Sequence, residues 1–303
     1  CATKKKCFFQ EQYGRQYRNL VEERKRFSLF KQALRRVEEH NAKYEAGEST
    51  YYKGINQFSD RSVAELSALF NTSRANRPTF KADVIYQKPE NVEVADSVNW
   101  KDEGVVTEVK DQGQCGSCWA FSVTGALEGQ YGIKYGSLVS LSEQDLMDCA
   151  TDYGTYGCDG GWMDQAYGYV RDYGIESESD YPYEETQGSC RHSSSVLTVK
   201  SHVSIPEGDE DSLKSATASA GPISVSIYAD TMFDYAGGVF NDACDGDYDH
   251  GVLVVGYGTD GSDYWLVKNS WGSAWGESGY MKIARNSNNK CSIASYATYP
   301  TIN

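Results

Sequence analysis

The sequence predicts an α+β protein in which a helical half precedes a sheet half, with a cleft between two lobes. Residues 15–45 and the segment from Ser117 onward repeat apolar side chains at helical spacing. After residue 195 the pattern changes to short apolar strands separated by turns. With 303 residues, 40% hydrophobic and 13% aromatic, the chain is long enough for two domains or one large one.

Charge is distributed unevenly along the chain. Residues 1–92 hold 18 Lys and Arg against 11 Asp and Glu, a net +7, and residues 93–303 hold 11 against 32, a net −21. We expect a basic head and an acidic body that attract each other, although a basic head taken alone also fits a solvated helical face. The acidic body argues against nucleic acid as a partner, because phosphates need positive charge.

No run of eighteen apolar residues occurs, so we expect no membrane span, and a signal peptide is expected to have been removed or omitted. Nine cysteines point to an oxidising compartment in which six or eight are paired and at least one thiol is free. Six paired cysteines allow fifteen pairings, which the residues alone do not resolve. The sequon Asn71-Thr72-Ser73 is consistent with secretion.

The basic head is predicted to contain one long amphipathic helix over residues 15–45. Its apolar positions are Tyr17, Leu20, Phe27, Phe30, Leu34 and Val37. A shorter helix over Ser62 to Phe70 should follow. Residues 71–95 should be extended, because Pro78 and Pro89 oppose regular structure.

In the acidic body, the helix from Ser117 places Cys118 in its first turn, where backbone amides and the helix dipole favour a thiolate. Residues 150–192 are rich in Gly, Tyr, Asp and Ser and are predicted to be loops held by disulfides. The predicted strands are 196–203, 251–257, 264–268 and 280–284, with a turn at Asp260-Gly261.

Three separated segments carry residues suited to thiol chemistry. They are Gln112-Gly-Gln-Cys-Gly-Ser-Cys-Trp-Ala-Phe121, Asp249-His250-Gly251 and Lys268-Asn269-Ser270-Trp271-Gly272. A cysteine is mostly protonated at neutral pH, so a cysteine nucleophile needs a base or a positive environment. The neighbouring Asp245, Asp247 and Asp249 are expected to favour protonated His250, and hence a thiolate-imidazolium pair.

These segments resemble the active site of papain-like cysteine proteases, and the basic head resembles the inhibitory propeptides of that family. Its long helix carries Glu22, Arg26, Phe30, Val37 and Asn41 of the family's interspersed helical pattern, with Ala33 where Asn is usual and Val37 where Ile is usual. The run Gly54-Ile55-Asn56-Gln57-Phe58-Ser59-Asp60 matches the family's GxNxFxD motif completely. The resemblance covers essentially the whole chain and is nearest to the cathepsin L branch.

The resemblance implies the roles of the site residues. Cys118 would be the nucleophile, His250 its base and later acid, and Asn269 the residue that orients the imidazole. Gln112 and the amide of Cys118 would form the oxyanion hole, and Trp271 would shield the His250–Asn269 hydrogen bond.

The resemblance also implies the substrate pocket and the disulfides. Substrate-binding residues would be Gly160, Gly161, Trp162, Met163, Ser226, Tyr248, Asp249, Trp271 and Tyr296. Tyr296 at the pocket floor should make it shallow, favouring compact aliphatic groups or proline over Phe, and no carboxylate is expected there to accept Arg. The implied disulfides are Cys115–Cys158, Cys149–Cys190 and Cys244–Cys291. Cys1 and Cys7 are left without an assignment.

Other functions stay open from the residues. Cys115-Gly-Ser-Cys118 is formally a CxxC and could be a redox pair or half a zinc site, but no βαβ pattern, second CxxC or paired histidines accompany it. The Asp245, Asp247, Asp249 spacing imitates a calcium loop but lacks its later Gly and Glu. A catalytically silent homologue that acts as a binding or storage protein is a further alternative.

The resemblance therefore implies the proenzyme of a cysteine endopeptidase with a papain-like two-lobed fold. Residues 1–93 would be the inhibitory propeptide, which occupies the cleft, and residues 94–303 the mature enzyme, cleaved near Val94. A mainly helical lobe would span about 104–205 and an antiparallel barrel-like β lobe about 206–303. We expect acid-triggered activation, with Asp60 as a local switch, and no cofactor or metal. The protein should be secreted or lysosomal, in an acidic lumen or digestive tract, and monomeric. Its partners would be protein and peptide substrates, its own propeptide and cystatin-like inhibitors.

Overall fold

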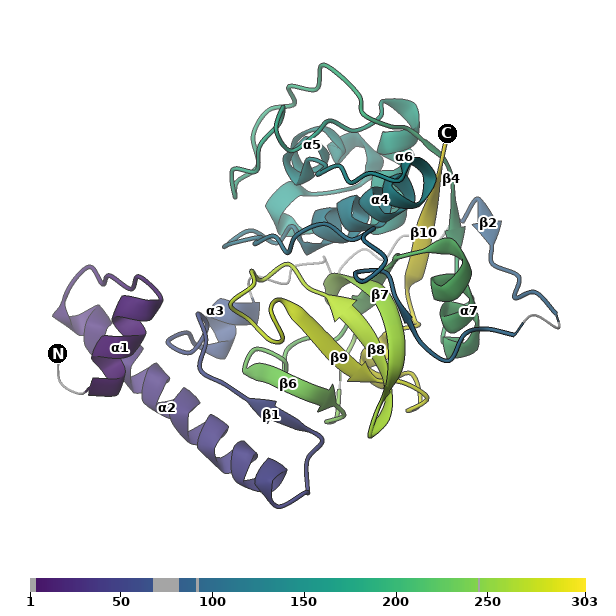
Figure 1. Ribbon diagram of the computed structural model, residues 1–303. Helices are drawn as coiled ribbons and strands as arrows, with labels where there is room; N and C mark the ends of the chain where they lie inside the picture. Colours follow the sequence, from purple (N-terminus) through teal and green to yellow (C-terminus); the bar gives the residue numbers. More distant parts are fainter. Residues whose placement is uncertain (1–3, 68–81, 91–92, 245) are drawn as a thin grey trace.

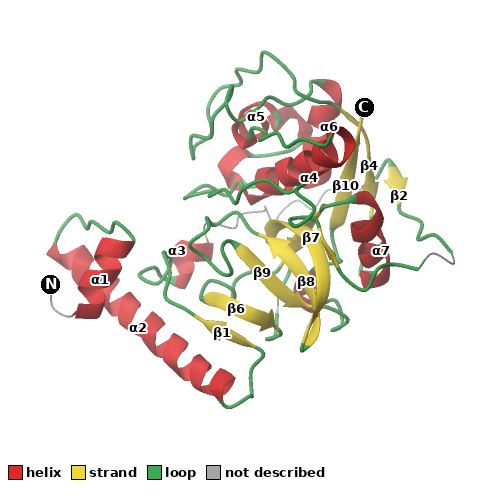
Figure 2. Cartoon of the chain, viewed as in Figure 1, coloured by secondary structure: helices red, strands yellow, loops and turns green. Residues whose placement is uncertain are grey.

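The computed structural model describes residues 4–67, 82–90, 93–244 and 246–303, with the backbone alone for residues 4–7. It confirms the α+β class, because a group of helices packs beside a mixed sheet (Figures 1 and 2). The first two helices, Lys4–Gln12 and Leu20–Glu45, lie away from the other helices. The second of them runs beside the edge strand Tyr51–Lys53 of the sheet (Figure 1). None of the helices within the described ranges is long and apolar enough to cross a membrane.

The N-terminal segment, residues 4–67, folds as α1 (Lys4–Gln12), α2 (Leu20–Glu45), β1 (Tyr51–Lys53) and α3 (Val63–Ser67). The predicted long helix begins five residues later than expected, because Asn19 is extended and its side chain caps the amides of Val21 and Glu22. Helix α1 was not predicted from the sequence. The predicted apolar face of α2 is correct at Phe30 and Val37, which are buried, and wrong at Leu20, which is 70% exposed in the first turn. The predicted helix beyond Ser67, the sequon at Asn71 and Cys1 lie outside the described residues.

The helical part of the body contains α4 (Cys118–Tyr135), α5 (Glu143–Cys149) and α6 (Met163–Asp172). Two single turns of 3₁₀ helix, Thr151–Tyr153 and Gly157–Asp159, lie between α5 and α6. The prediction that residues 150–192 are loops is therefore wrong for α6. Its buried residues include Met163, Ala166, Tyr167 and Val170, which have helical spacing that the abundance of Gly, Tyr and Asp obscured.

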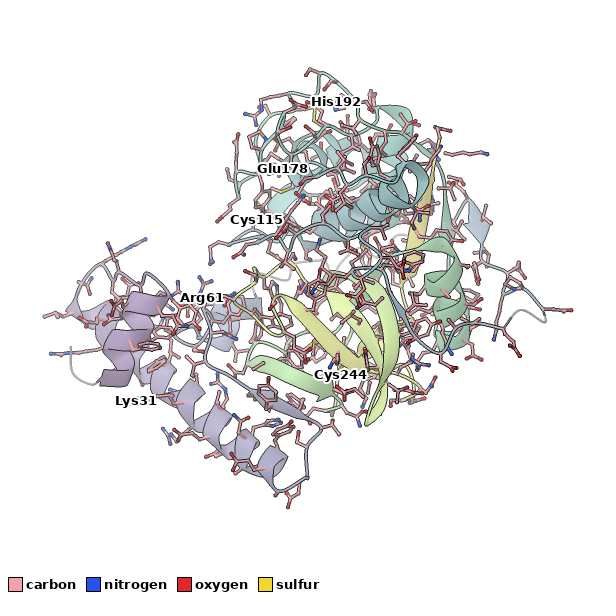
Figure 3. All side chains as sticks on the ribbon, viewed as in Figure 1. Lys31, Arg61, Cys115, Glu178, His192 and Cys244 are labelled. Carbon is pink, nitrogen blue, oxygen red and sulfur yellow. A yellow bond between two sulfur atoms is a disulfide. The ribbon has the colours of Figure 1, made fainter. Side chains whose placement is uncertain are left out.

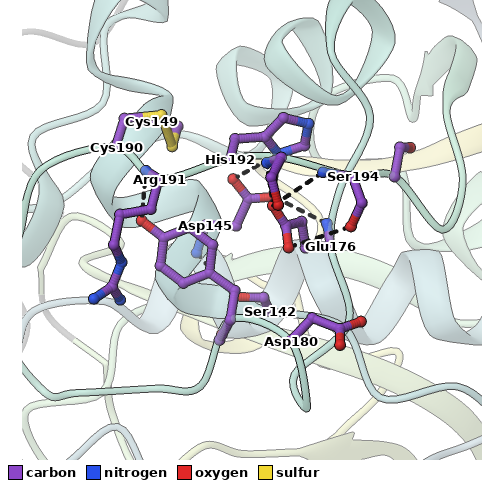
Figure 4. Close-up of polar contacts among 12 residues, drawn as sticks. Ser142, Asp145, Cys149, Glu176, Asp180, Cys190, Arg191, His192 and Ser194 are labelled. Carbon is purple, nitrogen blue, oxygen red and sulfur yellow. Dashed lines mark hydrogen bonds and ion pairs between the residues drawn. A yellow bond between two sulfur atoms is a disulfide. The ribbon is translucent and has the colours of Figure 1, made fainter.

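The long loop after α6 is anchored on α5 by a buried carboxylate. Asp145 accepts hydrogen bonds from Tyr169 Oη (2.8 Å) and from the amide of Glu176 (2.9 Å), and lies 3.0 Å from His192 Nδ1 (Figure 4). Glu176 in turn accepts the amides of Ser193 and Ser194, and these bonds lower the pKa of its carboxyl. Together with the Cys149–Cys190 disulfide, this network fixes a segment that has little regular structure.

The sheet has the strand order β1-β6-β9-β8-β7-β5-β10-β4-β2, and β3 also pairs with β7. Its strands in the body are β3 (Val98–Asn99), β4 (Val199–Ser204), β5 (Ile223–Ile227), β6 (Tyr235–Phe240), β7 (His250–Asp260), β8 (Ser262–Lys268), β9 (Tyr280–Ala284) and β10 (Ala297–Ile302). β2 (Val84–Ile85) pairs with β4 in parallel, β6 with β9 in parallel, and the other pairs are antiparallel. All four predicted strands are present, and the predicted turn joins β7 to β8 with φ +67° at Gly261.

Two large hydrophobic cores correspond to the two halves of the body. One is built around Trp119 and Leu146 under the helices, and the other around Trp265 and Trp275 under the sheet. Helix α7 (Glu210–Ala220) packs against β7, and a further 3₁₀ turn spans Lys290–Ser292. Helix α4 also packs against β7, so the first turn of α4 and the start of β7 lie in contact.

Candidate active site

Cys118 is the first residue of α4 and lies where the helical part meets the sheet. Its side chain is completely buried, and its Sγ accepts a hydrogen bond from the amide of Gly251 over 3.4 Å. A Cβ at Gly251 would lie 3.1 Å from the backbone of Trp119, so a side chain there would crowd this approach. The close contact brings His250, the first residue of β7, to the first turn of α4.

His250 Nε2 and Asn269 Oδ1 are 2.8 Å apart. The β7–β8 hairpin brings them together, since His250 begins β7 and Asn269 directly follows β8. Asn269 Oδ1 also accepts the amide of Ser270 (2.8 Å), so this atom is an acceptor and His250 Nε2 must donate to it. In the neutral ring, Nδ1 is therefore the nitrogen that accepts a proton.

Trp271 covers this pair. Its indole stacks on the imidazole of His250, with 4.8 Å between centroids and 26° between planes, and it is almost entirely buried. An apolar cover strengthens the His250–Asn269 hydrogen bond by lowering the local dielectric.

Gln112 lies next to this group and is held at four atoms. Its backbone amide donates to the Ser270 carbonyl (2.8 Å) and its carbonyl accepts from Tyr183 Oη (2.8 Å). Its Nε2 donates to the Cys115 carbonyl (2.9 Å), and its Oε1 accepts from Ser270 Oγ (2.8 Å). The structure thus gathers Gln112, Cys118, His250 and Asn269 around one place. Ser270 and Tyr183 were not singled out from the sequence, although Ser270 lies inside the Lys268–Gly272 run.

In this structure the sulfur and the imidazole favour their neutral forms. Burial raises the pKa of the Cys118 thiol to about 12, although the amides of Gly251 and Trp119 act in the opposite direction. Burial lowers the pKa of His250 to about 4, against the effect of Asn269. The expectation that acidic neighbours keep His250 protonated is therefore wrong here. The Asp249 carboxylate is bound to the amide of Ala229 (3.1 Å), Asp247 is exposed, and Asp245 lies outside the described residues.

The expected substrate pocket is an aromatic cluster. The ring of Trp162 lies 6.1 Å from that of Tyr248 and 5.1 Å from that of Tyr296. Met163 and Ser226 are buried beside it, and the amide of Ser226 donates to the Tyr296 carbonyl (3.0 Å).

A carboxylate lies directly beyond this cluster, bound to the hydroxyl of the Tyr296 that was expected at the pocket floor. The hydroxyl of Tyr296 donates to Asp164 Oδ1, and the amide of Asp164 donates back to the same hydroxyl (3.4 Å). Two glycines precede the cluster: Gly160 has φ +112°, and a Cβ at Gly161 would lie 2.7 Å from the Trp119 ring.

The disulfides are Cys115–Cys158, Cys149–Cys190 and Cys244–Cys291, the pairing that the resemblance implied. Among the cysteine side chains that the structure describes, Cys118 is the free thiol. Cys115 is therefore not available as a redox partner of Cys118. Over the described part of the chain, no group of three or more His, Cys, Asp or Glu side chains is arranged to hold a metal ion.

The N-terminal segment docks directly on the indole that covers His250. Phe58 lies edge-on to Trp271 (5.4 Å) and to Phe233 (5.9 Å). Gln57 Nε2 donates to the Trp271 carbonyl, and Asn56 Nδ2 to the Phe233 carbonyl, each over 2.6 Å. The motif that includes Asn56 and Phe58 thus contacts the site itself.

The other motif residues of the N-terminal segment hold it together. Asn41 exchanges two hydrogen bonds with the backbone of Lys53, and Arg26 binds Glu65 (3.0 Å) and lies 3.9 Å from Glu22. Asp60 is buried, accepts from Tyr17 Oη (2.9 Å) and lies 3.6 Å from Arg15. At Gly54 a Cβ would lie 3.0 Å from Ala236 Cβ, so the chain passes close to the body there.

A buried ionic group beside the site was not predicted. Lys110 Nζ lies 2.8 Å from Glu143 and 3.2 Å from Glu128. A cavity of about 20 Å³ connects these side chains with Asn269 and Ser270, which is space for one water molecule. The Lys110 partners Glu128 and Glu143 lie 18 and 33 residues further along the chain, so no local sequence pattern predicts the group.

Comparisons with known proteins agree with this geometry. The model of the papain family cysteine proteases matches residues 94–301, and that of the cathepsin propeptide inhibitor domain (I29) matches residues 8–66. Cathepsin L of Sarcophaga peregrina is 48% identical over 96% of this chain and 90% of its own length. Digestive cysteine proteinase 2 of Homarus americanus is 46% identical over 97% and 93%. The structure of digestive procathepsin L 3 from the larval midgut of Tenebrio molitor superposes with a TM-score of 0.90, at 48% identity and with 98% and 97% coverage.

Proposed function

Because the chain belongs to the papain family of cysteine proteases and carries a cathepsin propeptide inhibitor domain, we propose that Cys118, His250 and Asn269 form its catalytic triad. The observation that carries this assignment is the contact of Gly251 with the Cys118 sulfur, next to a His250 whose ring is oriented by Asn269. This contact supports the assignment, because a proposed nucleophile, base and orienting group then lie in one buried cluster.

The proposed reaction is acyl transfer. His250 takes the thiol proton at Nδ1, and the Cys118 sulfur attacks the carbonyl carbon of the peptide bond. The resulting oxyanion accepts hydrogen bonds from the Cys118 amide and the Gln112 side chain. The carbon–nitrogen bond then breaks, and His250 gives the proton to the leaving amine. Water, deprotonated by His250, attacks the thioester, releases the carboxylic acid and restores the thiol.

The chain is a zymogen, and its propeptide covers the Trp271 side of the site. We propose 1–93 as the propeptide and 94–303 as the mature enzyme, with processing near Val94. Two contacts support a boundary there, since Val94 packs against the sheet core and Tyr257 Oη donates to the Ala95 carbonyl (2.8 Å). In the mature region, about 104–205 would form the mainly helical lobe and about 206–303 the mainly β lobe.

Activation is proposed to be triggered by acid. Propeptide and body meet through charged pairs: Arg36 lies 3.0 Å from Asp234, and Lys88 lies 3.6 Å from Asp211. Protonation of the body's carboxylates removes their charge while Arg and Lys stay positive, so the attraction weakens as the pH falls. Asp60, buried between Tyr17 and Arg15, is the proposed local switch inside the propeptide.

The pocket for the side chain two places before the cleaved bond is proposed to be shallow. Tyr296 fills its floor and is held by Asp164, so the pocket presents a phenol ring rather than a free carboxylate. Compact aliphatic groups or proline should therefore be preferred over Phe and Arg. Gly160 and Gly161 would supply backbone hydrogen bonds to the substrate, as in the family.

The protein is proposed to act in an acidic lumen, lysosomal or digestive. Two of the compared proteins are described as digestive, which supports the second setting without excluding the first. Protein substrates and cystatin-like inhibitors would be its partners, and the enzyme would act as a monomer.

One experiment tests the assignment of the nucleophile. The zymogen is brought to acid pH, and hydrolysis of a fluorogenic dipeptidyl substrate is measured with and without an epoxysuccinyl thiol inhibitor. We expect hydrolysis that the inhibitor abolishes, with one label, found at Cys118 by peptide mapping. Propeptide release without hydrolysis would indicate a catalytically silent homologue. A label at Cys115 would instead indicate that Cys115 and Cys118 act as a redox pair.

A further inference from the structure

The last described part of the propeptide, residues 82–90, is seated on the body far from the active site. Its strand β2 lies beside β4 on the right side of Figure 1. Cys115, three residues before Cys118, lies on the opposite side of the helical part in Figure 3. Val84 pairs with Val203 and Ile85 with Ser204, in parallel, and the Tyr86 amide donates to the Ser204 carbonyl (2.8 Å).

The seated segment presents a carboxylate to two basic side chains of the body. Asp83 Oδ2 accepts the amide of His202 (3.1 Å) and lies 3.0 Å from its Nδ1, while Asp83 Oδ1 lies 3.7 Å from Arg171. The body as a whole carries −21, so the His202 amide and the Arg171 guanidinium, rather than the overall field, hold a carboxylate here.

Three residues further on, the side chain of Tyr86 is buried in the body. Its hydroxyl lies 2.9 Å from Ser215 Oγ on α7, and its ring stands edge-on to Tyr299 of β10 (6.5 Å). Tyr86 is 9% exposed, whereas Val84 and Ile85 are each 49% exposed. Asp83 and Tyr86, together with Lys88 3.6 Å from Asp211, are therefore the side chains of the segment that contact the body.

Everything that receives this segment belongs to the mature region. Arg171 lies on α6, His202 on β4, Ser215 on α7 and Tyr299 on β10. The His202 ring is held by stacking on Tyr167 (6.1 Å, 28°). Once residues 82–90 leave, β4 has no partner on that side among the described strands, and such an edge is a template for another extended chain.

We propose that the mature enzyme keeps this edge of β4 as a second peptide-binding site, which takes an extended peptide with an Asp three residues before a Tyr. The inference rests on the proposed release of the propeptide by cleavage near Val94. The first such ligand is the chain's own segment, and other extended peptides of the same chemistry would compete with it. Tethering raises the effective concentration in the zymogen, so free peptides should bind more weakly.

The test uses the activated enzyme, blocked at Cys118 with an epoxysuccinyl inhibitor so that peptides are not cut. A fluorescent peptide of residues 82–90 is titrated, and its anisotropy is followed. We expect saturable binding with a Kd below about 1 mM, and weakening by about tenfold for the peptide variants Asp83→Asn and Tyr86→Ala. A scrambled peptide should not bind.

Enzyme variants locate the site. Arg171→Gln replaces an exposed side chain and should weaken binding by roughly 3- to 10-fold, while the control Lys134→Gln, on α4, should leave it unchanged. Absence of saturable binding, equal binding of the scrambled peptide, or binding only to the unblocked enzyme would overturn the proposal. Turnover of the dipeptidyl substrate, measured before blocking, reports the active site separately, so failure of one proposal is distinguishable from failure of the other.

Discussion

The ring of Phe58 stands edge-on to the indole of Trp271 at 5.4 Å, and that indole stacks on the imidazole of His250 at 4.8 Å. A propeptide side chain thus touches the residue that covers the His250–Asn269 hydrogen bond. The docking surface of Phe58 is therefore the same indole that stacks on His250.

Replacing Phe58 by Ala should therefore release inhibition. Phe58 is 7% exposed, and truncating a buried Phe costs about 3 kcal/mol, which is roughly a 100-fold weaker hold of the propeptide. The variant zymogen should show dipeptidyl hydrolysis at neutral pH, where the parent is silent. Phe8→Ala, at a position 66% exposed, is the matched control. If the Phe58→Ala zymogen hydrolysed the substrate no faster than the parent at neutral pH, this contact would not hold the propeptide.

The thiol of the zymogen should react slowly with alkylating reagents. Burial raises the pKa of Cys118 to about 12, so at pH 8 only about one thiol in 10⁴ is ionised. The rate of iodoacetamide labelling should rise about tenfold per pH unit from 7 to 9 in the zymogen. After activation it should be faster and depend less on pH. A zymogen that reacts as fast as the activated enzyme would contradict the neutral pair described here.

The Tyr296–Asp164 hydrogen bond gives a specificity test with two arms. Tyr296→Ala should deepen the pocket and uncover Asp164, raising kcat/KM for both Phe and Arg two places before the cleaved bond by about tenfold. Adding Asp164→Asn should remove the gain for Arg and keep the gain for Phe. Peptide-library profiling measures both. A parent enzyme that already prefers Phe or Arg would show that Tyr296 does not limit the pocket.

Glu65 should stabilise the propeptide without being its acid trigger. Its hydrogen bonds with Ser62 and Arg26 lower its pKa to about 2. A carboxyl with a lowered folded-state pKa contributes stability above its unfolded pKa of about 4.3, and this contribution is lost as the pH falls toward the folded value. Glu65→Gln should therefore ease propeptide release by about 0.5 kcal/mol at pH 7 and at pH 5 alike, with the difference shrinking only below about pH 4.

Urea titration of propeptide release across this pH range measures the effect. Glu45→Gln, at an exposed position at the end of α2, serves as the control and should match the parent. If the difference between Glu65→Gln and the parent disappeared already between pH 6 and pH 5, Glu65 would be part of the acid switch after all.

Much of the fold was accessible from the sequence because its signals are local. The hairpin that carries His250 and Asn269 consists of two apolar strands joined by a turn that the sequence marks. The helix that begins at Cys118 has apolar residues at helical spacing. Helix α6 was missed although its buried residues have helical spacing, because its glycine and tyrosines suggested a loop.

The proposed catalytic residues could be selected from motifs, but their protonation states could not. Burial sets the pKa of His250 and Cys118, and burial depends on every segment that packs around them. Asp164 is adjacent in sequence to Met163, yet only the structure shows that it faces Tyr296. The ionic group of Lys110, Glu128 and Glu143 comes from separate parts of the chain. No short stretch of sequence therefore predicts it.

The helical part and the sheet of the body are not independent folding units, because each end of residues 94–303 crosses to the other part. Near the start of this range, β3 pairs with β7 in the sheet, and Trp100 Nε1 donates to the Thr217 carbonyl (2.7 Å) on α7. At the other end, β10 returns to α4, where Tyr135 Oη donates to the Asn303 carbonyl (3.2 Å). A backbone cut between the two parts would therefore leave the two fragments interlocked, and neither fragment expressed alone would hold a complete core.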